Sequence, residues 1–334
     1  MAKKARRTYT VIAAAALLLC AGFCVWFGVR NRSYISYCRS VGVPVLKAAR
    51  HFGKPGADNE WAMAAVLAAD QGNWLKLKEL TATDRHSVFC TYYHNLANAK
   101  LGSLSDGLLD YYQPFERGLF LPVQEGQTPF IIGCASEVWW QLGAMTQAEH
   151  ATILGMTFSP NHKGERFMRR LAEINLVNGD EAAAAKYIAA LRRPLDGAWK
   201  EKIPLKPTSD TLVLASDYRA VLLNLLEGNP ANAMAYEYLL CYDLLTKDIP
   251  HFMEDYDPEG PHSKVYDEVA LTGLVMEGML SEDVASRYGI DSGTAQEFFE
   301  YSELYQRCGG RMDDLQDRFG KTYWFFYHFA RRNE

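Results

Sequence analysis

Residues Arg166–Leu191 read RFMRRLAEINLVNGDEAAAAKYIAAL. Apolar residues recur in the first half at the three- and four-residue spacing of a helix, until Gly179-Asp180 interrupts the pattern. Glycine accepts the left-handed backbone at a helix C-terminus, and a new helix can begin at once in the alanine-rich run 182–185. The segment therefore predicts two consecutive helices joined by a tight turn.

The same arrangement recurs along the chain as an apolar-periodic stretch, a glycine before a polar or small residue, and a second apolar-periodic stretch. Period-2 alternation and paired hairpin turns are absent, which disfavours strands. Successive turn glycines are separated by 30, 41, 36 and 49 residues, which bracket a helix-pair period of about 34 residues. The predicted repeat-turn residues are Gly72, Gly102, Gly143, Gly179 and Gly228.

The Arg166–Leu191 unit resembles a tetratricopeptide repeat, with Leu171 and Ala172 at the large and small positions of the first helix and Ala184 at the small position of the second. This resemblance implies an all-α fold in which about five helix pairs stack as a right-handed α-solenoid. The other units lack the complete repeat pattern, so the exact repeat number stays open.

The RLAEINLVNGD unit, the later segment MAYEYLLCYDLLTKDIPHFM at Met234–Met253 and an apolar N-terminal segment together resemble an uncharacterised bacterial family of membrane proteins with a tetratricopeptide-like C-terminal region. The resemblance covers residues 58–330 and implies a bacterial inner-membrane location. Family members commonly carry many transmembrane helices, whereas one is expected here, and the resemblance implies no activity or cofactor.

The N-terminal apolar segment, residues 8–29, has 22 residues without a formal charge, and Lys3, Lys4, Arg6 and Arg7 precede it. A helix of that length just spans a hydrocarbon core about 30 Å thick, so we expect a single-pass anchor. A cleaved signal peptide is the alternative, although its apolar run is usually shorter, about 7–15 residues. Four basic residues precede the segment and three, Arg30, Arg32 and Arg39, follow it. The larger number before it favours a cytoplasmic N-terminus, which places residues 30–334 outside the cytoplasm.

Breaker residues divide the remainder of the chain. The folded body is expected to begin near Asp58, a plausible N-cap, and proline-rich stretches at 113–131 and 192–210 are expected to project from the array and contact partners. Helices are predicted at 264–278, 281–288, 293–307 and 321–331 in a C-terminal cap. The predicted organisation is 1–30 tail and anchor, 31–57 juxtamembrane connector, 58–250 helix pairs, and 251–334 cap.

Composition and motifs exclude several functions. The net charge of −5 with mixed signs argues against nucleic-acid binding. Nucleophile, phosphate-loop and metal-ligand motifs are missing from the sequence, so neither a cofactor nor catalysis is expected. The run DYDPEG at 255–260 imitates the start of a calcium loop but has Tyr266 at the twelfth position, where a carboxylate is needed.

Three functions remain open. The first is a membrane-anchored scaffold that binds a protein or peptide partner in an open groove, with no buried cluster of titratable groups. The second is a structural accessory to a polytopic membrane complex, which predicts an apolar stripe from the anchor into the connector. The third is an enzyme whose pocket gathers His86, His94, His150, Glu137 and Asp110. Under the first, the expected partner-binding residues are Trp139, Trp140 and Tyr236.

Overall fold

The computed structural model describes residues 2–83, 85–124, 126–192, 194–195 and 217–332. Within these ranges every regular element is helical, which confirms the all-α prediction. The elements are α1 (Ala2–Arg30), α2 (Arg32–Ser40), α3 (Val45–Phe52), α4 (Ala57–Asp70), α5 (Trp74–Thr81), α6 (Val88–Lys100), the 3₁₀ helices η1 (Leu108–Asp110) and η2 (Phe115–Gly118), α7 (Pro129–Ile132), α8 (Ser136–Leu142), α9 (Met145–Phe158), α10 (Glu165–Asn178), α11 (Glu181–Ala189), α12 (Tyr218–Gly228), α13 (Ala233–Thr246), α14 (Ile249–Asp255), α15 (Lys264–Met276), α16 (Glu282–Arg287), α17 (Ser292–Arg307), α18 (Met312–Phe319) and α19 (Tyr323–Phe329).

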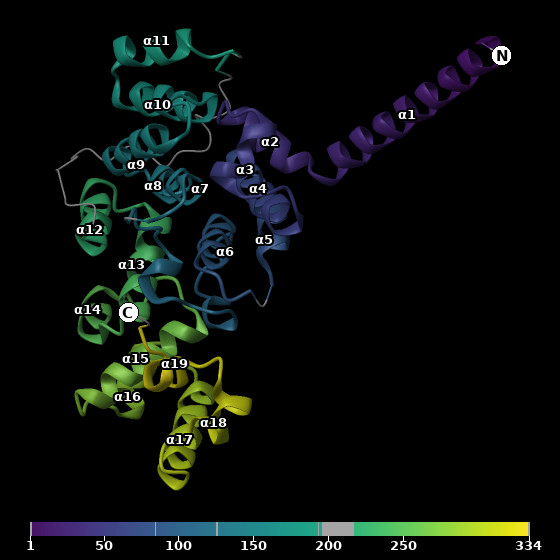
Figure 1. Cartoon of the computed structure of the whole chain (residues 1–334). Coiled ribbons are helices and arrows are strands. Elements are labelled where there is room, and N and C mark those ends of the chain that lie inside the picture. Colours follow the sequence, from purple (N-terminus) through teal and green to yellow (C-terminus); the bar gives the residue numbers. More distant parts are fainter. Residues whose placement is uncertain (1, 84, 125, 193, 196–216, 333–334) are drawn as a thin grey trace.

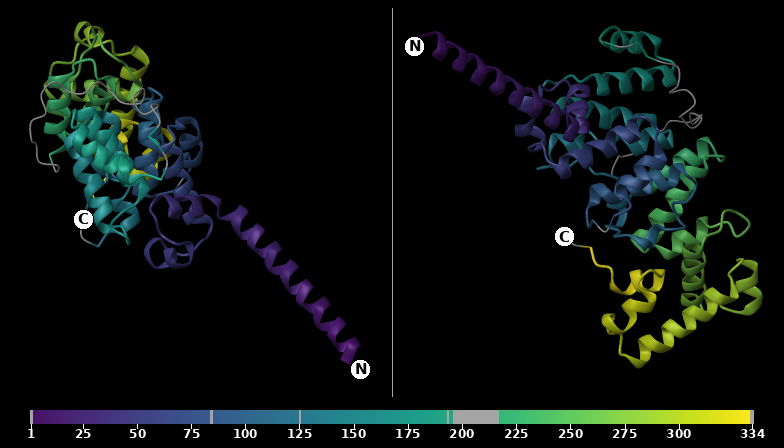
Figure 2. Two further views of the ribbon diagram at one scale, coloured as in Figure 1. Left: turned by 90° about the horizontal axis from the view of Figure 1, so that it is seen from above. Right: turned by 90° about the vertical axis from the view of Figure 1, so that its right-hand side faces the viewer.

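Helix α1 projects from the body and meets it only at the α1–α2 junction (Figures 1 and 2). Among the described residues, no single helix is both long and apolar enough to cross a membrane. The pair Ala15–Arg30 and Arg32–Ser40, bent by 76°, meets that requirement of length and composition together.

The connector predicted at 31–57 is part of the folded body. Tyr34, Tyr37 and Cys38 of α2 are fully buried, and α2 packs along α4. Helix α4 begins at Ala57, one residue before the expected N-cap, and the Asp58 carboxylate in its first turn pairs with Arg85 at 2.9 Å instead. The body therefore begins at α2, because the aromatic face of α2 needs the apolar face of α4 to cover it.

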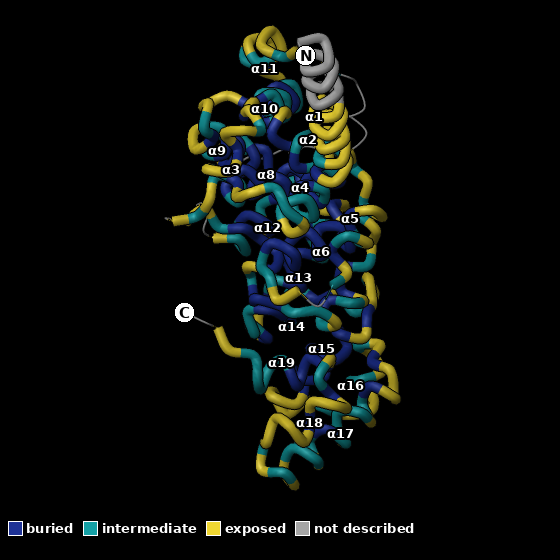
Figure 3. The backbone as a smooth tube through the Cα atoms, turned by 45° about the vertical axis from the view of Figure 1, so that its right-hand side comes forward, coloured by how far each residue is buried: buried dark blue, intermediate teal, exposed yellow. Residues whose placement is uncertain are grey.

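The body is an elongated stack that runs from α11 at one end to α17 and α18 at the other, with its buried residues along the middle (Figures 1 and 3). Helices that are consecutive in the chain pack on one another, including α4 with α5, α8 with α9, and α10 with α11. Residues of the C-terminal end also reach back to the middle of the stack, where Lys321 pairs with Asp110 at 2.8 Å.

Four of the five predicted turn glycines have the left-handed backbone, with φ of 67° at Gly72, 70° at Gly102, 85° at Gly143 and 79° at Gly179. Gly228 differs, because it is the last residue of α12 and does not have a positive φ. The chain turns one residue later at Asn229, which has an extended backbone because Pro230 follows it.

The segment 113–131 is irregular, as predicted, but its middle part lies in the core and does not project. Leu119, Phe120 and Leu121 are buried in the main core, and Phe120 stacks on Trp139 with ring centroids 4.6 Å apart. A proline- and glycine-rich segment can thus line a core when its apolar residues are contiguous. The second expected projection, 192–210, lies mostly outside the described residues.

The C-terminal region contains the helices expected there, together with α14 and α18. The aromatic run of α19 is largely internal, with Tyr323, Trp324 and Phe325 buried. Glu268 of α15 accepts a hydrogen bond from the backbone amide of Tyr323 at 2.6 Å and so caps the start of α19. Burial raises the pKa of Glu268 to about 7.

Candidate functional site

A polar pocket of about 820 Å³ lies between α2, α4, α8, α9 and α10, a volume in the usual range for ligand sites. Five arginines and three carboxylates are among its lining residues, so cationic groups outnumber anionic ones there. The charged lining residues are Arg39, Arg166, Arg169, Arg170 and Arg192, with Asp70, Glu165 and Glu173.

Arg166 forms the inner wall and holds three segments together. Its Nε donates to both carboxylate oxygens of Asp70, at 3.0 and 2.9 Å, and its Nη1 donates to the carbonyl oxygen of Gly133 at 2.6 Å. The Arg166 side chain is 10% exposed, and a buried arginine needs this degree of pairing. Its role is therefore structural: it links α4 and α10 with the residue that follows α7.

Arg170 lies one helical turn further along α10, over the face of Trp140, with its Cζ 4.4 Å from the ring centroid. Its Nη2 donates to Glu137 at 2.9 Å, and its Nε is 3.8 Å from Glu173. Among the described residues, Arg170 Nη1 and Gln141 Oε1 are buried without a hydrogen-bond partner. Each buried polar atom without a partner costs about 1–3 kcal/mol of folding free energy, so the hydrogen bonding of this pocket wall is incomplete.

The two glutamates respond differently to burial. Burial raises the pKa of Glu137, but Arg170 and Arg166 outweigh that effect and hold the pKa below its ordinary value. Burial raises the pKa of Glu173, and Arg170 and Arg169 offset only part of the rise. Glu137 is therefore a fixed anion beneath the pocket, whereas Glu173 is a carboxyl that is poorly compensated at the pocket wall.

Arg39 and Arg192 are exposed, and within the described ranges neither side chain has an ion-pair partner. Guanidinium groups of this kind bind carboxylate or phosphate oxygens through paired N–H donors. The pocket thus combines walls whose arginines are paired with carboxylates and the two exposed cationic groups of Arg39 and Arg192. The exposed groups suit an anionic ligand or an acidic segment of a partner.

A family described as "Family of unknown function (DUF6057)" matches residues 3–196 and 194–330. The chain belongs to this family. No curated protein and no solved structure matches the chain. The expectation of an uncharacterised family is confirmed at this level, and the description of the family makes no mention of tetratricopeptide repeats.

In this family member, the residues expected to bind a partner lie mainly in the interior. Trp139 is 5% exposed and Trp140 is 3% exposed, and Trp140 reaches the pocket as the surface beneath Arg170. Tyr236 is half-buried, and its hydroxyl donates to the carbonyl oxygen of Asp255 at 3.1 Å. Their role in partner binding stays a prediction, and a direct contact with Trp140 would go through the pocket.

The five residues considered for an enzyme do not all share one environment: His94, His86 and Asp110 lie around residues 110–112, whereas His150 is exposed on α9. His94 is buried beside Thr81, and burial lowers the pKa of His94 to about 4. His86 stacks on Tyr112 and Asp110 pairs with Lys321, whereas Glu137 is buried beneath the arginine pocket and pairs with Arg170. In the part of the chain that the structure describes, no group of three or more His, Cys, Asp or Glu side chains is arranged to hold a metal.

Arg166 and Arg170 were not predicted as site residues, although both lie in the segment that gave the helix pair. Their i, i+4 spacing places them on one face of α10. The sequence could have indicated this site through two arginines on a partly apolar face of a predicted helix. Their carboxylate partners, Asp70 and Glu137, are 96 and 33 residues away, which no local pattern reveals.

Proposed function

We propose that this protein is a membrane-anchored scaffold that binds an acidic segment of a protein partner close to the membrane surface. The main support is that the apolar side chains of α1 are exposed, whereas the next helix, α2, is packed into the body. The protein would act by binding, and the short connection from α1 to the body would keep the binding surface close to the bilayer.

Helix α1 supports the anchor because its described apolar residues are exposed around the helix. The exposed fractions run from 52% to 75% for Leu17, Leu18, Leu19, Phe23, Val25, Trp26 and Val29. At 100° per residue, successive positions such as 17, 18 and 19 point in different directions, so a single protein groove would not cover them. Lipid covers such a helix on all sides.

The repeat resemblance supports a solenoid body. In the α10–α11 pair, Leu171, Ala172 and Ala184 are all fully buried, as the large and small positions of a tetratricopeptide pair require. Gly179 makes the left-handed turn between the two helices. We infer that the consecutive helix pairs form a solenoid-like array, which offers an extended surface for a peptide or partner helix.

The arginine pocket is the favoured docking point, although its buried cluster of charged side chains differs from the cluster-free groove expected for a scaffold. The cluster consists of Arg166, Arg170, Glu137 and Glu173. The pocket lies between α2 and α10, so it is beside the helix that leaves the anchor. The exposed guanidinium groups of Arg39 and Arg192 suit Asp or Glu side chains of a partner. The accessory-subunit alternative has less support, because the apolar side chains Tyr34 and Tyr37 face the body and do not extend an apolar stripe from α1.

Crosslinking with mass spectrometry on the full-length protein in its membrane tests the proposal. The informative variant is Arg39→Glu with Arg192→Glu, which reverses the charge at the pocket. Arg287→Glu is the matched control, because Arg287 is also exposed, without an ion-pair partner in the described chain, and lies on α16.

A partner that crosslinks near the pocket in the wild type and the Arg287→Glu control, and is lost in the double variant, supports the scaffold. A version lacking residues 1–30 should lose the same crosslinks if the anchor confines the binding. The proposal is wrong if no protein is enriched over that truncated version.

A further inference from the structure

The N-terminal part of the chain has a one-sided charge. Asp58 is the first acidic residue, and every charged side chain before it is basic. The whole protein nevertheless has a net charge of −5, so the acidic residues are concentrated after this point. Between α1 and Asp58 the chain therefore presents cationic groups at the place where it leaves the proposed anchor.

Four of these cationic side chains and one leucine lie at the start of α2, on α3 and just after α3, and we name this set the basic face. All five are exposed, and within the described residues none of the four cations has a carboxylate partner. Two basic residues further along the chain differ, since Lys76 pairs with Glu79 at 2.8 Å and Arg85 with Asp58 at 2.9 Å. The basic face consists of Arg32, Leu46, Lys47, Arg50 and Lys54.

Leu46 is the most exposed large apolar side chain among the described residues, at 99%. It lies on α3 four residues before Arg50, so the two side chains are neighbours on one side of the helix. Ala48 and Phe52, on the other side, are buried in the body and fix the rotation of α3. The leucine is thus held outward next to Arg50, and Lys47 lies about 100° from it around the helix. An exposed apolar side chain beside cationic ones is the pattern of an interfacial helix.

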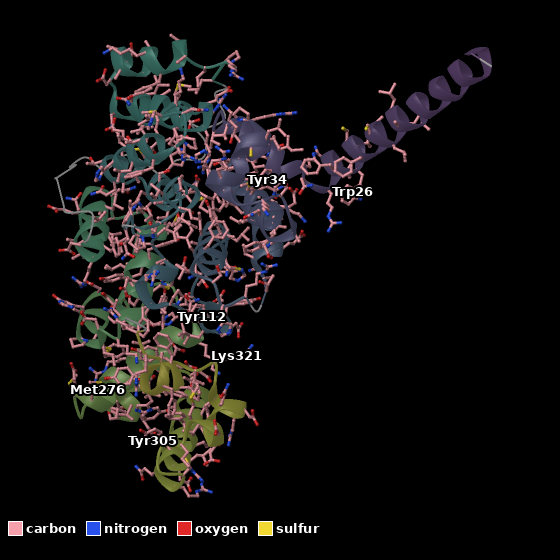
Figure 4. The ribbon with its side chains drawn as sticks, viewed as in Figure 1. Trp26, Tyr34, Tyr112, Met276, Tyr305 and Lys321 are labelled. Atoms are coloured by element: carbon pink, nitrogen blue, oxygen red, sulfur yellow. The ribbon has the colours of Figure 1, made fainter. Side chains whose placement is uncertain are left out.

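The geometry places this face beside the start of α1. Only Asn31 separates α1 from α2, and the two helices meet at 76°. An α1 that crosses a membrane upright therefore leaves α2 nearly parallel to the membrane surface. Helices α2 and α3 lie on the side of the body from which α1 emerges (Figures 1 and 2). Tyr34 lies at this junction, whereas Trp26 lies out along α1 (Figure 4).

We propose that the basic face binds the anionic headgroups of the membrane and that Leu46 enters the headgroup region. Clustered Lys and Arg next to a membrane span are attracted to anionic lipid, and the attraction fades within about 10 Å at ordinary salt. The face is a second contact with the bilayer, which sets the tilt of the body and hence the direction of the arginine pocket. This inference rests on the proposed anchor.

Hydrogen exchange of the full-length protein in nanodiscs tests the proposal, because it reports on α1 and α3 in the same sample. The discs contain phosphatidylcholine alone, or phosphatidylcholine with roughly a third phosphatidylglycerol. The variants are Leu46→Glu and the pair Lys47→Glu with Arg50→Glu. Met276→Glu is the control, because Met276 is 60% exposed and lies near the opposite end of the body (Figure 4). Unchanged exchange in α10 and α13 verifies that each variant is folded.

In the wild type and the Met276→Glu control, amides of α3 should exchange about tenfold more slowly in anionic discs than in neutral discs. Raising the salt to about 0.5 M should remove most of that difference. Both basic-face variants should exchange at the neutral-disc rate in either disc. If α1 stays protected while α3 ignores the lipid charge, the basic-face proposal is wrong and the anchor stands. If α1 itself exchanges freely in the discs, both proposals fail.

Discussion

Glu60, in the first turn of α4, accepts a hydrogen bond from the backbone amide of Tyr34 at 2.8 Å and another from Ser33 at 2.7 Å. These amides are unpaired donors at the N-terminus of α2, so one carboxylate from a different helix caps α2. The Tyr34 hydroxyl also donates to the carbonyl oxygen of Gly53 at 2.8 Å. Through these contacts α2 is fixed to the body within a few residues of the end of α1.

Replacing Glu60 with glutamine should weaken this junction. The substitution keeps the shape but removes the charge and one of the two acceptor oxygens, so we expect a loss of about 1 kcal/mol in the free energy of unfolding. Urea unfolding of the full-length protein in detergent measures it. Glu79→Gln is the control, because its pair with Lys76 is exposed and worth little. An equal effect of the two substitutions would contradict the capping role.

The stability of the protein should depend on the ionisation of Asp243. Asp243 is fully buried near Arg219, and burial raises its pKa to about 7 despite that guanidinium group. The unfolded chain has an aspartate pKa of about 3.9, so between these values the folded protein keeps a proton that the unfolded chain releases. The stability that Asp243 gains from this retained proton is fully present below about pH 4 and is lost as the pH rises to about 7.

Asp243→Asn should therefore gain stability relative to the wild type as the pH is raised from about 4 to about 7, because asparagine does not ionise. Urea unfolding at several pH values measures the difference. Asp313→Asn, at an exposed site, corrects for changes in the remainder of the protein. A difference between wild type and Asp243→Asn that is constant with pH would show that Asp243 does not titrate in this window.

Phe120 should be a major contributor to the core although it lies in an irregular segment. Its ring stacks on Trp139 and on Tyr218, with centroids 4.6 and 4.5 Å apart. We expect Phe120→Ala to destabilise the fold by about 3–5 kcal/mol, through lost burial and the cavity that remains. Phe299→Ala, at a site that is 57% exposed, should cost far less in the same thermal or urea unfolding assay. Similar losses at both sites would mean that 113–131 is not part of the core.

Gly155 should not tolerate even a methyl group. A Cβ atom at this position would lie 2.9 Å from Cε1 of Phe167 and 3.1 Å from the Cα of Gly133. Since the second contact is with backbone, α7 and α9 would have to separate, and we expect Gly155→Ala to cost about 1–3 kcal/mol of unfolding free energy. Gly28→Ala is the control, because a Cβ atom there would meet nothing within 4 Å. Unchanged stability of Gly155→Ala would show that α7 and α9 are not closely packed at Gly155.

The sequence by itself determined the helical class and several of the helix ends. Gly179 could be placed at a left-handed turn because the requirement is local: a helix must end, and glycine adopts that backbone without a steric penalty. The uncharged run at 8–29 was visible for a similar reason, since apolar length is a property of consecutive residues.

The tertiary structure decided which polar groups meet. Glu60 caps a helix that begins 28 residues earlier, and the partner of Arg166 is Asp70, 96 residues away. Neither pairing has a periodic signal, because each depends on how the buried faces of α2, α4 and α10 stack. The stacking also buried Trp139 and Trp140, which looked suitable for a surface, and left Leu46 exposed. Local hydrogen bonding fixes a helix and its ends, whereas only long-range packing determines which of its faces remains open to a partner or a membrane.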